Sequence, residues 1–191
     1  MNTAEPIRDP KDLMNFKNYF KYVKPHPRNY LLIALGLNTA LRISDILELR
    51  WDDVCTSDFR YVQHIIVKQK KTGKSTVIYL NQNVHEALAA YEQSVMHPFN
   101  KFSYIFKNSK GKPISRIQAY RIITEAAEYC HIEGVISPHS LRKTFGYYAW
   151  KQGVQPALLQ ELYQHSSYAI TKRYLGIDQD ELDEVYKRIN L

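Results

Sequence analysis

Two β-rich runs joined by a short turn are the feature that most constrains how this chain folds. Residues 61–67 and 75–80 are rich in β-branched and aromatic side chains, and the basic stretch 70–74 between them contains Thr72-Gly73. This pattern predicts a β-hairpin with a basic tip. Residues 104–106, which precede Lys110-Gly111, predict no more than a short strand or an extended segment.

Helical signals fill the rest of the chain. Asp9-Pro10 combines an N-cap with a proline in the first turn, and apolar residues at helical spacing follow it. Ser137-Pro138 repeats this arrangement and opens a helix that we expect to end near Gly153. Further helices are predicted over 30–35, from Asn38-Thr39 to Leu49, from Asn83, from Ser115, from Pro156 and over 178–189. The predicted fold class is mainly α with a small antiparallel β-sheet (α+β).

The length of the chain suits one domain. Its 191 residues compare with about 150 for a typical domain. No repeat, low-complexity tract or linker divides it. We therefore expect a single domain over 1–191, closed by an acidic amphipathic helix over 178–191.

Charge and cysteine usage narrow the class of protein. Lys and Arg outnumber Asp and Glu by 26 to 19, and the resulting net charge of +7 favours a polyanionic partner such as nucleic acid. Membrane headgroups and acidic proteins attract the same charge, so charge alone does not identify the partner. No stretch approaches the ~18 apolar residues of a membrane span, and we expect a cytoplasmic protein without a membrane partner. Cys55 and Cys130 lack the spacing of a zinc site or disulfide framework and are expected to be inert.

Two pairs of charged side chains have helical spacing. Arg42 and Asp45 are three residues apart in one predicted helix, and His139 and Arg142 are three apart in another, so each pair shares a helix face. An isolated pair of this kind is usually an ordinary surface ion pair or a capping pair. Arg42, however, follows Thr39-Ala40-Leu41 in apolar surroundings, which favours a functional role.

A histidine, a tyrosine and a lysine complete the candidate set. His165 precedes Tyr174 by nine residues, which allows a turn to return both side chains to one cavity. Tyr168 is the nearest competing tyrosine, but it follows His165 by only three residues. Lys71 lies on the predicted hairpin tip, where a cluster of lysines is usually just solvated, and Lys74 is the alternative there.

Three motifs stand at these positions: residues 41–49 (LRISDILEL), 138–142 (PHSLR) and 165–167 (HSS), the last followed by Tyr174. Together they resemble the tyrosine recombinase (phage integrase) family. In that family an arginine, a hairpin lysine, a His-x-x-Arg pair, a later His or Trp, and a tyrosine form the active site. The resemblance covers nearly the whole chain and assigns these roles, in the family's order, to Arg42, Lys71, His139, Arg142, His165 and Tyr174.

The resemblance implies an enzyme that cuts and rejoins double-stranded DNA through a 3′-phosphotyrosyl link to Tyr174. The two arginines would neutralise charge on the non-bridging phosphate oxygens, with His165 as a further donor. His139 would act as the base, oriented by Asp45, and Lys71 would protonate the leaving 5′-oxygen. Neither a metal nor another cofactor is expected. The expected assembly on DNA is a dimer or tetramer of this chain, which could be a monomer when free.

The chain departs from the family pattern in a few places. Gln164 stands where the family often has glycine, and Lys143 stands where histidine is common. Only about forty residues precede Arg42, whereas full-length integrases carry a helical core-binding domain there. We therefore expect either a minimal recombinase, similar to the fimbrial phase-variation invertases, or an isolated catalytic domain. The helix over 178–191 either closes the fold or, as the family implies, docks on a neighbouring protomer.

Other functions remain open at this point. A type IB topoisomerase would share the chemistry but relax supercoils without a sequence requirement. A DNA-binding regulator with the same fold and no catalysis is a second alternative, although every catalytic position is filled. A metal- or serine-dependent hydrolase is poorly supported, because neither an HExxH nor a GxSxG motif occurs.

Overall fold

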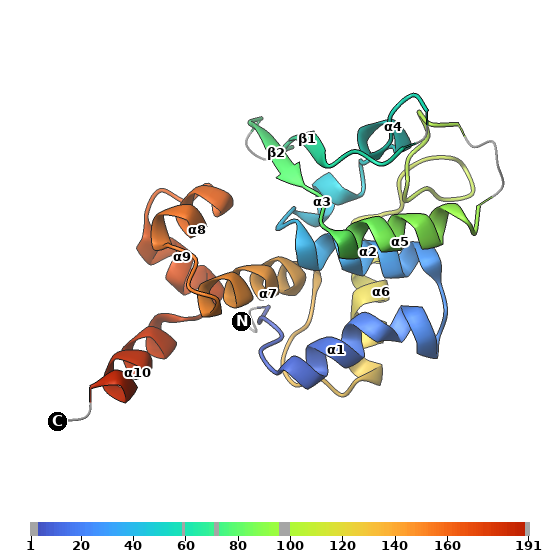
Figure 1. The fold of residues 1–191 in the computed structure, drawn as a ribbon. Helices are drawn as coiled ribbons and strands as arrows, with labels where there is room; N and C mark the ends of the chain where they lie inside the picture. The colour runs from blue at the N-terminus through green and yellow to red at the C-terminus, as the bar shows by residue number, and fades with distance from the viewer. Residues whose placement is uncertain (1–3, 59, 71–72, 96–99, 190–191) are drawn as a thin grey trace.

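The computed structural model describes residues 4–58, 60–70, 73–95 and 100–189 of the chain (Figure 1). Helices predominate, and the described residues contain one two-stranded antiparallel sheet, so the predicted fold class is confirmed. The elements are α1 (Pro10–Asn18), the π-helical turn η1 (Tyr19–Val23), α2 (Pro27–Asn38), α3 (Ile43–Ile46), α4 (Trp51–Val54), β1 (His64–Lys68), β2 (Ser75–Tyr79), α5 (Gln82–Glu92), α6 (Arg116–Tyr129), α7 (Pro138–Lys151), α8 (Pro156–Tyr163), α9 (Tyr168–Leu175) and α10 (Asp178–Arg188).

The predicted hairpin is formed by β1 and β2, in a register that pairs His64 with Tyr79. Ile65 and Val67 of β1 are buried, and the residues between and beside them are exposed. This alternation is expected of a strand with one face on the core. The hairpin projects from the upper edge of the main body in Figure 1.

Three boundaries differ from the prediction, the first being the N-cap of α5, which is Asn81 rather than Asn83. The first strand begins at His64, because Tyr61 forms an isolated bridge with the end of α4 instead. The helix predicted up to Leu49 is interrupted, and a separate short α3 starts at Ile43. The cause is Ala40, whose φ of 53° is left-handed and cannot belong to a right-handed helix.

The core of the main body is built around α2. Residues 31–37 are all buried, and α1, α5 and α7 lie against this helix. Gly36 permits the close approach of α7, since a Cβ there would lie 2.5 Å from the Cδ1 atom of Leu141. Leu141 immediately precedes Arg142, so this packing fixes the position of a predicted site residue.

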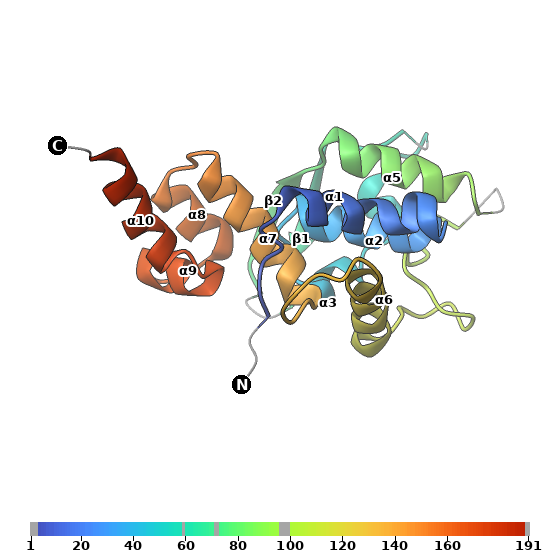
Figure 2. The same ribbon diagram turned by 90° about the horizontal axis from the view of Figure 1, so that it is seen from below.

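Helix α7 connects the main body to a smaller group of helices, α8 to α10, which lie to one side in both views (Figures 1 and 2). Tyr147, Tyr163, Leu175 and Ile177 form a second buried cluster at this end. A Cβ at Gly146 would collide with the side chains of Tyr163 and Leu175. The glycine therefore allows α8 and α9 to pack directly on α7.

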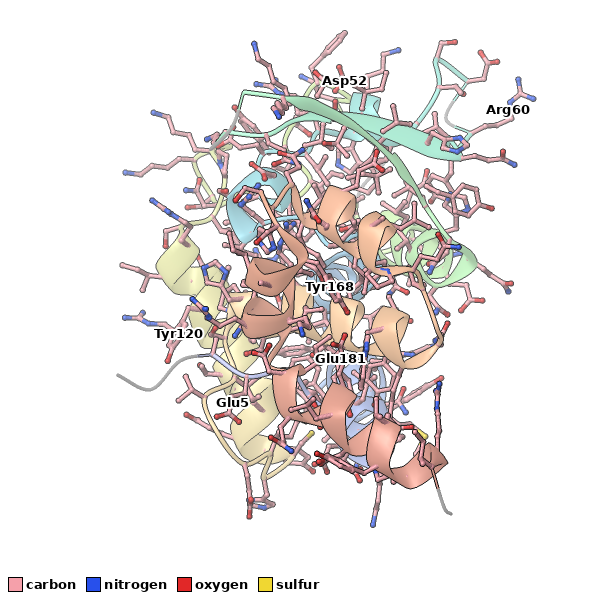
Figure 3. The ribbon with its side chains drawn as sticks, turned by 90° about the vertical axis from the view of Figure 1, so that its left-hand side faces the viewer. Glu5, Asp52, Arg60, Tyr120, Tyr168 and Glu181 are labelled. Atoms are coloured by element: carbon pink, nitrogen blue, oxygen red, sulfur yellow. The ribbon has the colours of Figure 1, made fainter. Side chains whose placement is uncertain are left out.

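In the described part of the chain, the ion pairs and side-chain hydrogen bonds that attach α10 to other elements lie near its start. Arg8 forms a salt bridge with Asp180 at 2.8 Å, and the Tyr168 hydroxyl on α9 donates to Glu181. Figure 3 labels these last two residues in neighbouring parts of the helical group. The helix has no buried residue, and its apolar side chains beyond Glu181 are exposed.

Candidate active site

The segment that carries Arg42 is a turn stabilised by Thr39. The Thr39 hydroxyl donates to the Leu35 carbonyl at 2.7 Å and accepts from the Leu41 amide at 3.3 Å. The chain turns at Ala40, and Arg42 then stands in extended conformation as the N-cap of α3. The prediction that Arg42 lies inside a helix is wrong, because the left-handed residue ends the preceding helix first.

The start of α7 matches the prediction. Pro138 occupies the first helical turn after the N-cap Ser137. His139 is exposed, whereas Arg142, one turn later, has only 5% of its surface accessible. Both side chains line one cavity of about 530 Å³, together with Arg42. The expected sharing of a face by His139 and Arg142 therefore holds in the structure.

Arg142 is a buried cation that forms no salt bridge with a carboxylate of the described residues. Its Nη1 atom donates to the Ala40 carbonyl, and its guanidinium lies 4.6 Å from the centre of the Tyr163 ring. Burial lowers the pKa of Arg142. Among the residues that the structure describes, no Asp or Glu forms a salt bridge with it. A guanidinium held in this way attracts an anion from outside the chain.

Arg42 approaches the same cavity from the other side. Its Nη1 atom donates to the side-chain oxygen of Gln69, which directly follows β1. Arg116 adds positive charge to the cavity wall, whereas the charge of Lys70 there is paired with Glu48. The cavity therefore has the charge and the donors expected of a phosphate-binding site.

Tyr174 projects from α9 toward Arg142. Its ring lies 5.3 Å from that of Tyr163 and 5.4 Å from that of His165, measured between centroids, and the Lys143 ammonium lies 5.1 Å from its centre. Its hydroxyl is buried and faces the Arg142 guanidinium, without a hydrogen bond of standard geometry to any described residue. Burial raises the pKa of Tyr174, and the nearby positive charge of Arg142 opposes that rise. The structure thus brings the predicted nucleophile beside a predicted phosphate-binding arginine within one chain.

His165 is oriented from two directions. Its Nδ1 atom lies 3.1 Å from the hydroxyl of Thr171, and its ring stacks on Tyr163 with centroids 5.6 Å apart. Thr171 is buried and lies three residues before Tyr174, so α9 presents both side chains on one face. The predicted return of His165 and Tyr174 to one place is therefore observed.

The structure describes only some of the predicted site residues at the hairpin. Lys71, the predicted general acid, lies outside the described residues. Next to it, the Lys70 amide donates to Asp45 Oδ1 at 3.1 Å, and the Lys70 ammonium forms a 2.7 Å salt bridge with Glu48. Asp45 is buried, and its observed hydrogen bonds lead to Lys70 and to the neighbouring Ser44. Its predicted role in orienting His139 stays a prediction.

Sequence reasoning missed three residues that shape the site: Gln69, Tyr163 and Thr171. Each of them contributes through a hydrogen bond to a residue of another element or turn. In the sequence, only the position of Thr171, one helical turn before Tyr174, indicated that it could lie near the site. The competing Tyr168 bonds Glu181 on α10, and burial raises its pKa. Its hydroxyl therefore serves to attach α10 to α9.

The cysteines and potential metal ligands of the described residues do not assemble into a further site. Cys55 and Cys130 are free thiols, and burial raises the pKa of Cys55 to about 11, which disfavours its reactive thiolate form. Across residues 4–58, 60–70, 73–95 and 100–189, no three His, Cys, Asp or Glu side chains cluster as metal ligands. Over the same residues, no helix has the length and apolar character needed to cross a membrane.

Comparison with known proteins places these residues in a family context. The chain matches the model of the Phage integrase family over residues 8–181. It is 39% identical to a probable integrase/recombinase, YoeC, of Bacillus subtilis over 98% of this chain and 97% of that protein. It is 30% identical to the type 1 fimbriae regulatory protein FimE of Escherichia coli over 86% of this chain and 82% of that protein.

The fold has the same relatives. The structure aligns with the XerH site-specific recombinase, solved bound to a palindromic difH substrate in a post-cleavage complex, with a TM-score of 0.76 and 20% identity. That alignment covers 97% of this chain and 53% of the XerH chain. The chain therefore has the fold of a tyrosine recombinase catalytic domain and spans about half the length of that solved protein.

Proposed function

On the premise that this chain belongs to the phage integrase family and is a tyrosine recombinase, we propose that it is a site-specific DNA recombinase whose nucleophile is Tyr174. The observation that carries the proposal is the pairing of two buried groups. Within the described residues, the Tyr174 hydroxyl faces the Arg142 guanidinium without a hydrogen bond of standard geometry, and Arg142 has no carboxylate partner. A phosphodiester supplies both missing contacts, an electrophile for the phenol and an anion for the guanidinium.

Arg142 and Arg42 bind the scissile phosphate in this proposal. The attack places additional negative charge on two non-bridging oxygens, and a planar guanidinium can hold such oxygens by two hydrogen bonds. Both arginines line one cavity, and neither can lose its charge near neutral pH. His165, held by Thr171, donates a further hydrogen bond to the phosphate.

Tyr174 attacks the phosphorus atom. Because burial raises the pKa of its phenol, a base must remove the proton as the bond forms, and His139 on the cavity wall takes that role. The Oη–P bond forms while the bond from phosphorus to the 5′-oxygen breaks, and Lys71 protonates the departing 5′-oxygen. The phosphotyrosyl ester conserves the energy of the broken phosphodiester bond. A 5′-hydroxyl from a second strand can therefore attack the ester, release Tyr174 and reseal the DNA.

The assembly on DNA involves α10. Its outer face carries four exposed apolar side chains at helical spacing: Leu182, Val185, Tyr186 and Ile189. A groove of about 860 Å³ lies between β2 and α8 and is lined by apolar residues such as Val77, Phe145, Leu158 and Leu162. We propose that α10 of a second copy docks in this groove when two protomers bind adjacent sites.

A nicked suicide DNA substrate tests the catalytic proposal. The wild-type protein should form a covalent complex that survives SDS, and Tyr174→Phe should form none. Tyr168→Phe is the matched control, since it removes a partly buried hydroxyl from the same helix and should still form the complex. Binding without any covalent complex would indicate a DNA-binding regulator, and relaxation of supercoils without a sequence requirement would indicate a topoisomerase.

A pair of variants on α10 tests the assembly. Tyr186→Asp should leave the protein monomeric on DNA that carries two sites, as measured by analytical ultracentrifugation. Lys187→Asp introduces the same side chain on another face of the helix and should preserve the assembly. Equal behaviour of the two variants would contradict docking through the apolar face.

A further inference from the structure

Gln164 ends α8 in a conformation that suits glycine better than glutamine. Its φ of 55° and ψ of 38° are left-handed, and a residue with a Cβ atom adopts this region at a cost. Its side-chain oxygen is also buried without a hydrogen-bond partner in the described part of the chain. Neither feature stabilises the turn, and the hydrogen bond that the structure shows for this side chain is made by its nitrogen.

That nitrogen begins a chain of hydrogen bonds that ends at Arg42. Gln164 Nε2 donates to the hydroxyl of Thr76 at 3.2 Å. The same hydroxyl accepts from Gln69 Nε2 at 3.0 Å. The side-chain oxygen of Gln69 then accepts from Arg42. Three side chains thus connect the end of α8 to an arginine of the candidate site.

This series of hydrogen bonds joins three parts of the protein that are far apart in sequence. Gln69 is buried at the end of β1. Its backbone amide donates to the Lys74 carbonyl at 2.9 Å and so continues the hydrogen-bond pairing of the hairpin. Thr76 lies in β2, and Gln164 directly precedes His165. The hairpin is therefore bonded on one side to Arg42 and on the other to the turn that leads into α9.

We propose that Gln164, Thr76 and Gln69 are positioning residues, which hold Arg42 and the hairpin in register with the helix that carries Tyr174. This inference rests on the proposed recombinase function. Arg42 has a long, flexible side chain, and one acceptor fixes its guanidinium while leaving the other four N–H groups for phosphate. Gln164 makes the position of that guanidinium depend on the same turn that places His165.

Gln164→Gly separates this proposal from a purely local role in the turn. The change relieves the left-handed strain and removes the unpaired oxygen, so the melting temperature should not fall. The single-turnover rate of DNA cleavage should nevertheless fall by about three- to tenfold, the range expected for one lost hydrogen bond. A cleavage rate equal to or above that of the wild type would overturn the proposal.

Two variants at Thr76 check the same network from the hairpin side. Thr76→Val keeps the shape and removes the hydroxyl, and it should slow cleavage to a similar extent as Gln164→Gly. Thr76→Ser keeps the hydroxyl and should cleave at nearly the wild-type rate. DNA affinity should be unchanged in all three variants, because positioning acts on the reaction step. A loss confined to affinity would contradict the assignment.

Hydrogen exchange without DNA tests the network independently of catalysis. In Gln164→Gly, the Gln69 amide in the hairpin should exchange at least about threefold faster, although the changed residue lies at the end of α8. Gln155→Gly, at the exposed start of the same helix, is the control and should leave that exchange unchanged. Unchanged exchange in both Gln164→Gly and Thr76→Val would refute the network. If the wild type forms no covalent DNA complex, the recombinase function fails, and the exchange result still decides whether the network exists.

Discussion

The hydroxyl groups of Tyr174 and Tyr163 should have opposite effects on stability, although the two rings are neighbours. The Tyr163 hydroxyl donates to the Arg142 carbonyl at 2.7 Å, whereas the Tyr174 hydroxyl is buried beside the Arg142 guanidinium without a hydrogen bond of standard geometry to a described residue. Changing either tyrosine to phenylalanine removes one buried oxygen and keeps the ring. The two variants therefore isolate the contribution of each hydroxyl.

The size of each effect follows from these contacts. Burial of a hydroxyl without a hydrogen bond costs about 1–3 kcal/mol, and the charge of Arg142 offsets part of that cost at Tyr174. Tyr174→Phe should therefore increase the free energy of unfolding by about 1 kcal/mol, which raises the melting temperature by about 2–4 °C for a chain of this size. Tyr163→Phe loses a formed bond and should lower both quantities by similar amounts.

Thermal unfolding followed by circular dichroism at neutral pH measures both variants against the wild type. Tyr174→Phe should be the more stable protein and should form no covalent DNA complex, which is the combination expected of a side chain placed for reaction at the expense of stability. If Tyr174→Phe melts below the wild type, the hydroxyl has a stabilising partner in the free protein. The reasoning from an unpaired, reaction-ready phenol would then be refuted.

Three further outcomes are expected. Arg142→Ala should reduce single-turnover cleavage by about 10² or more while DNA is still bound, as measured on the nicked substrate; a smaller loss would contradict its role in phosphate binding. DNA affinity should fall steeply and linearly on a logarithmic scale of salt concentration, and a flat response would argue against phosphate contacts in the cavity. Stability should decrease in alkali, because burial raises the folded-state pKa of Tyr19, to about 12, and also that of Tyr61 above the value near 10 of free tyrosine. The folded protein thus holds these protons more tightly, so the stabilisation is complete below about pH 10 and is lost as pH rises through the folded-state values. Melting temperatures measured between about pH 8 and 12 should show this loss, and Tyr61→Phe should show a shallower one.

Local patterns were enough to predict most elements. The Ser137-Pro138 cap and the alternating strand around Ile65 depend on neighbouring residues in the chain, and both appear as expected. The interruption before Arg42 was not predictable, because nothing in the type of residue at Ala40 indicates a positive φ. The contact made at this residue comes from a distant helix, since Arg142 on α7 donates to the Ala40 carbonyl.

The candidate site likewise contains residues that the sequence predicted and residues that it did not. Motif spacing selected Arg42, His139, Arg142 and Tyr174, and the structure brings three of them to one cavity with the tyrosine beside Arg142. Their catalytic roles stay predictions until the variants are measured. Gln69 was missed because its significance depends on Arg42, 27 residues away, and on Thr76.

By itself the amino-acid sequence determined the chemistry available to this protein: which residues carry charge, which can act as nucleophiles, and which short segments become helices or strands. Only the tertiary structure decided that the Tyr174 hydroxyl and the Arg142 guanidinium share a buried space, and that Gln164 reaches Thr76 across 88 residues of chain. The physical reason is that burial and hydrogen-bond pairing depend on the arrangement of distant segments. Short-range spacing reports only on neighbours within a few turns.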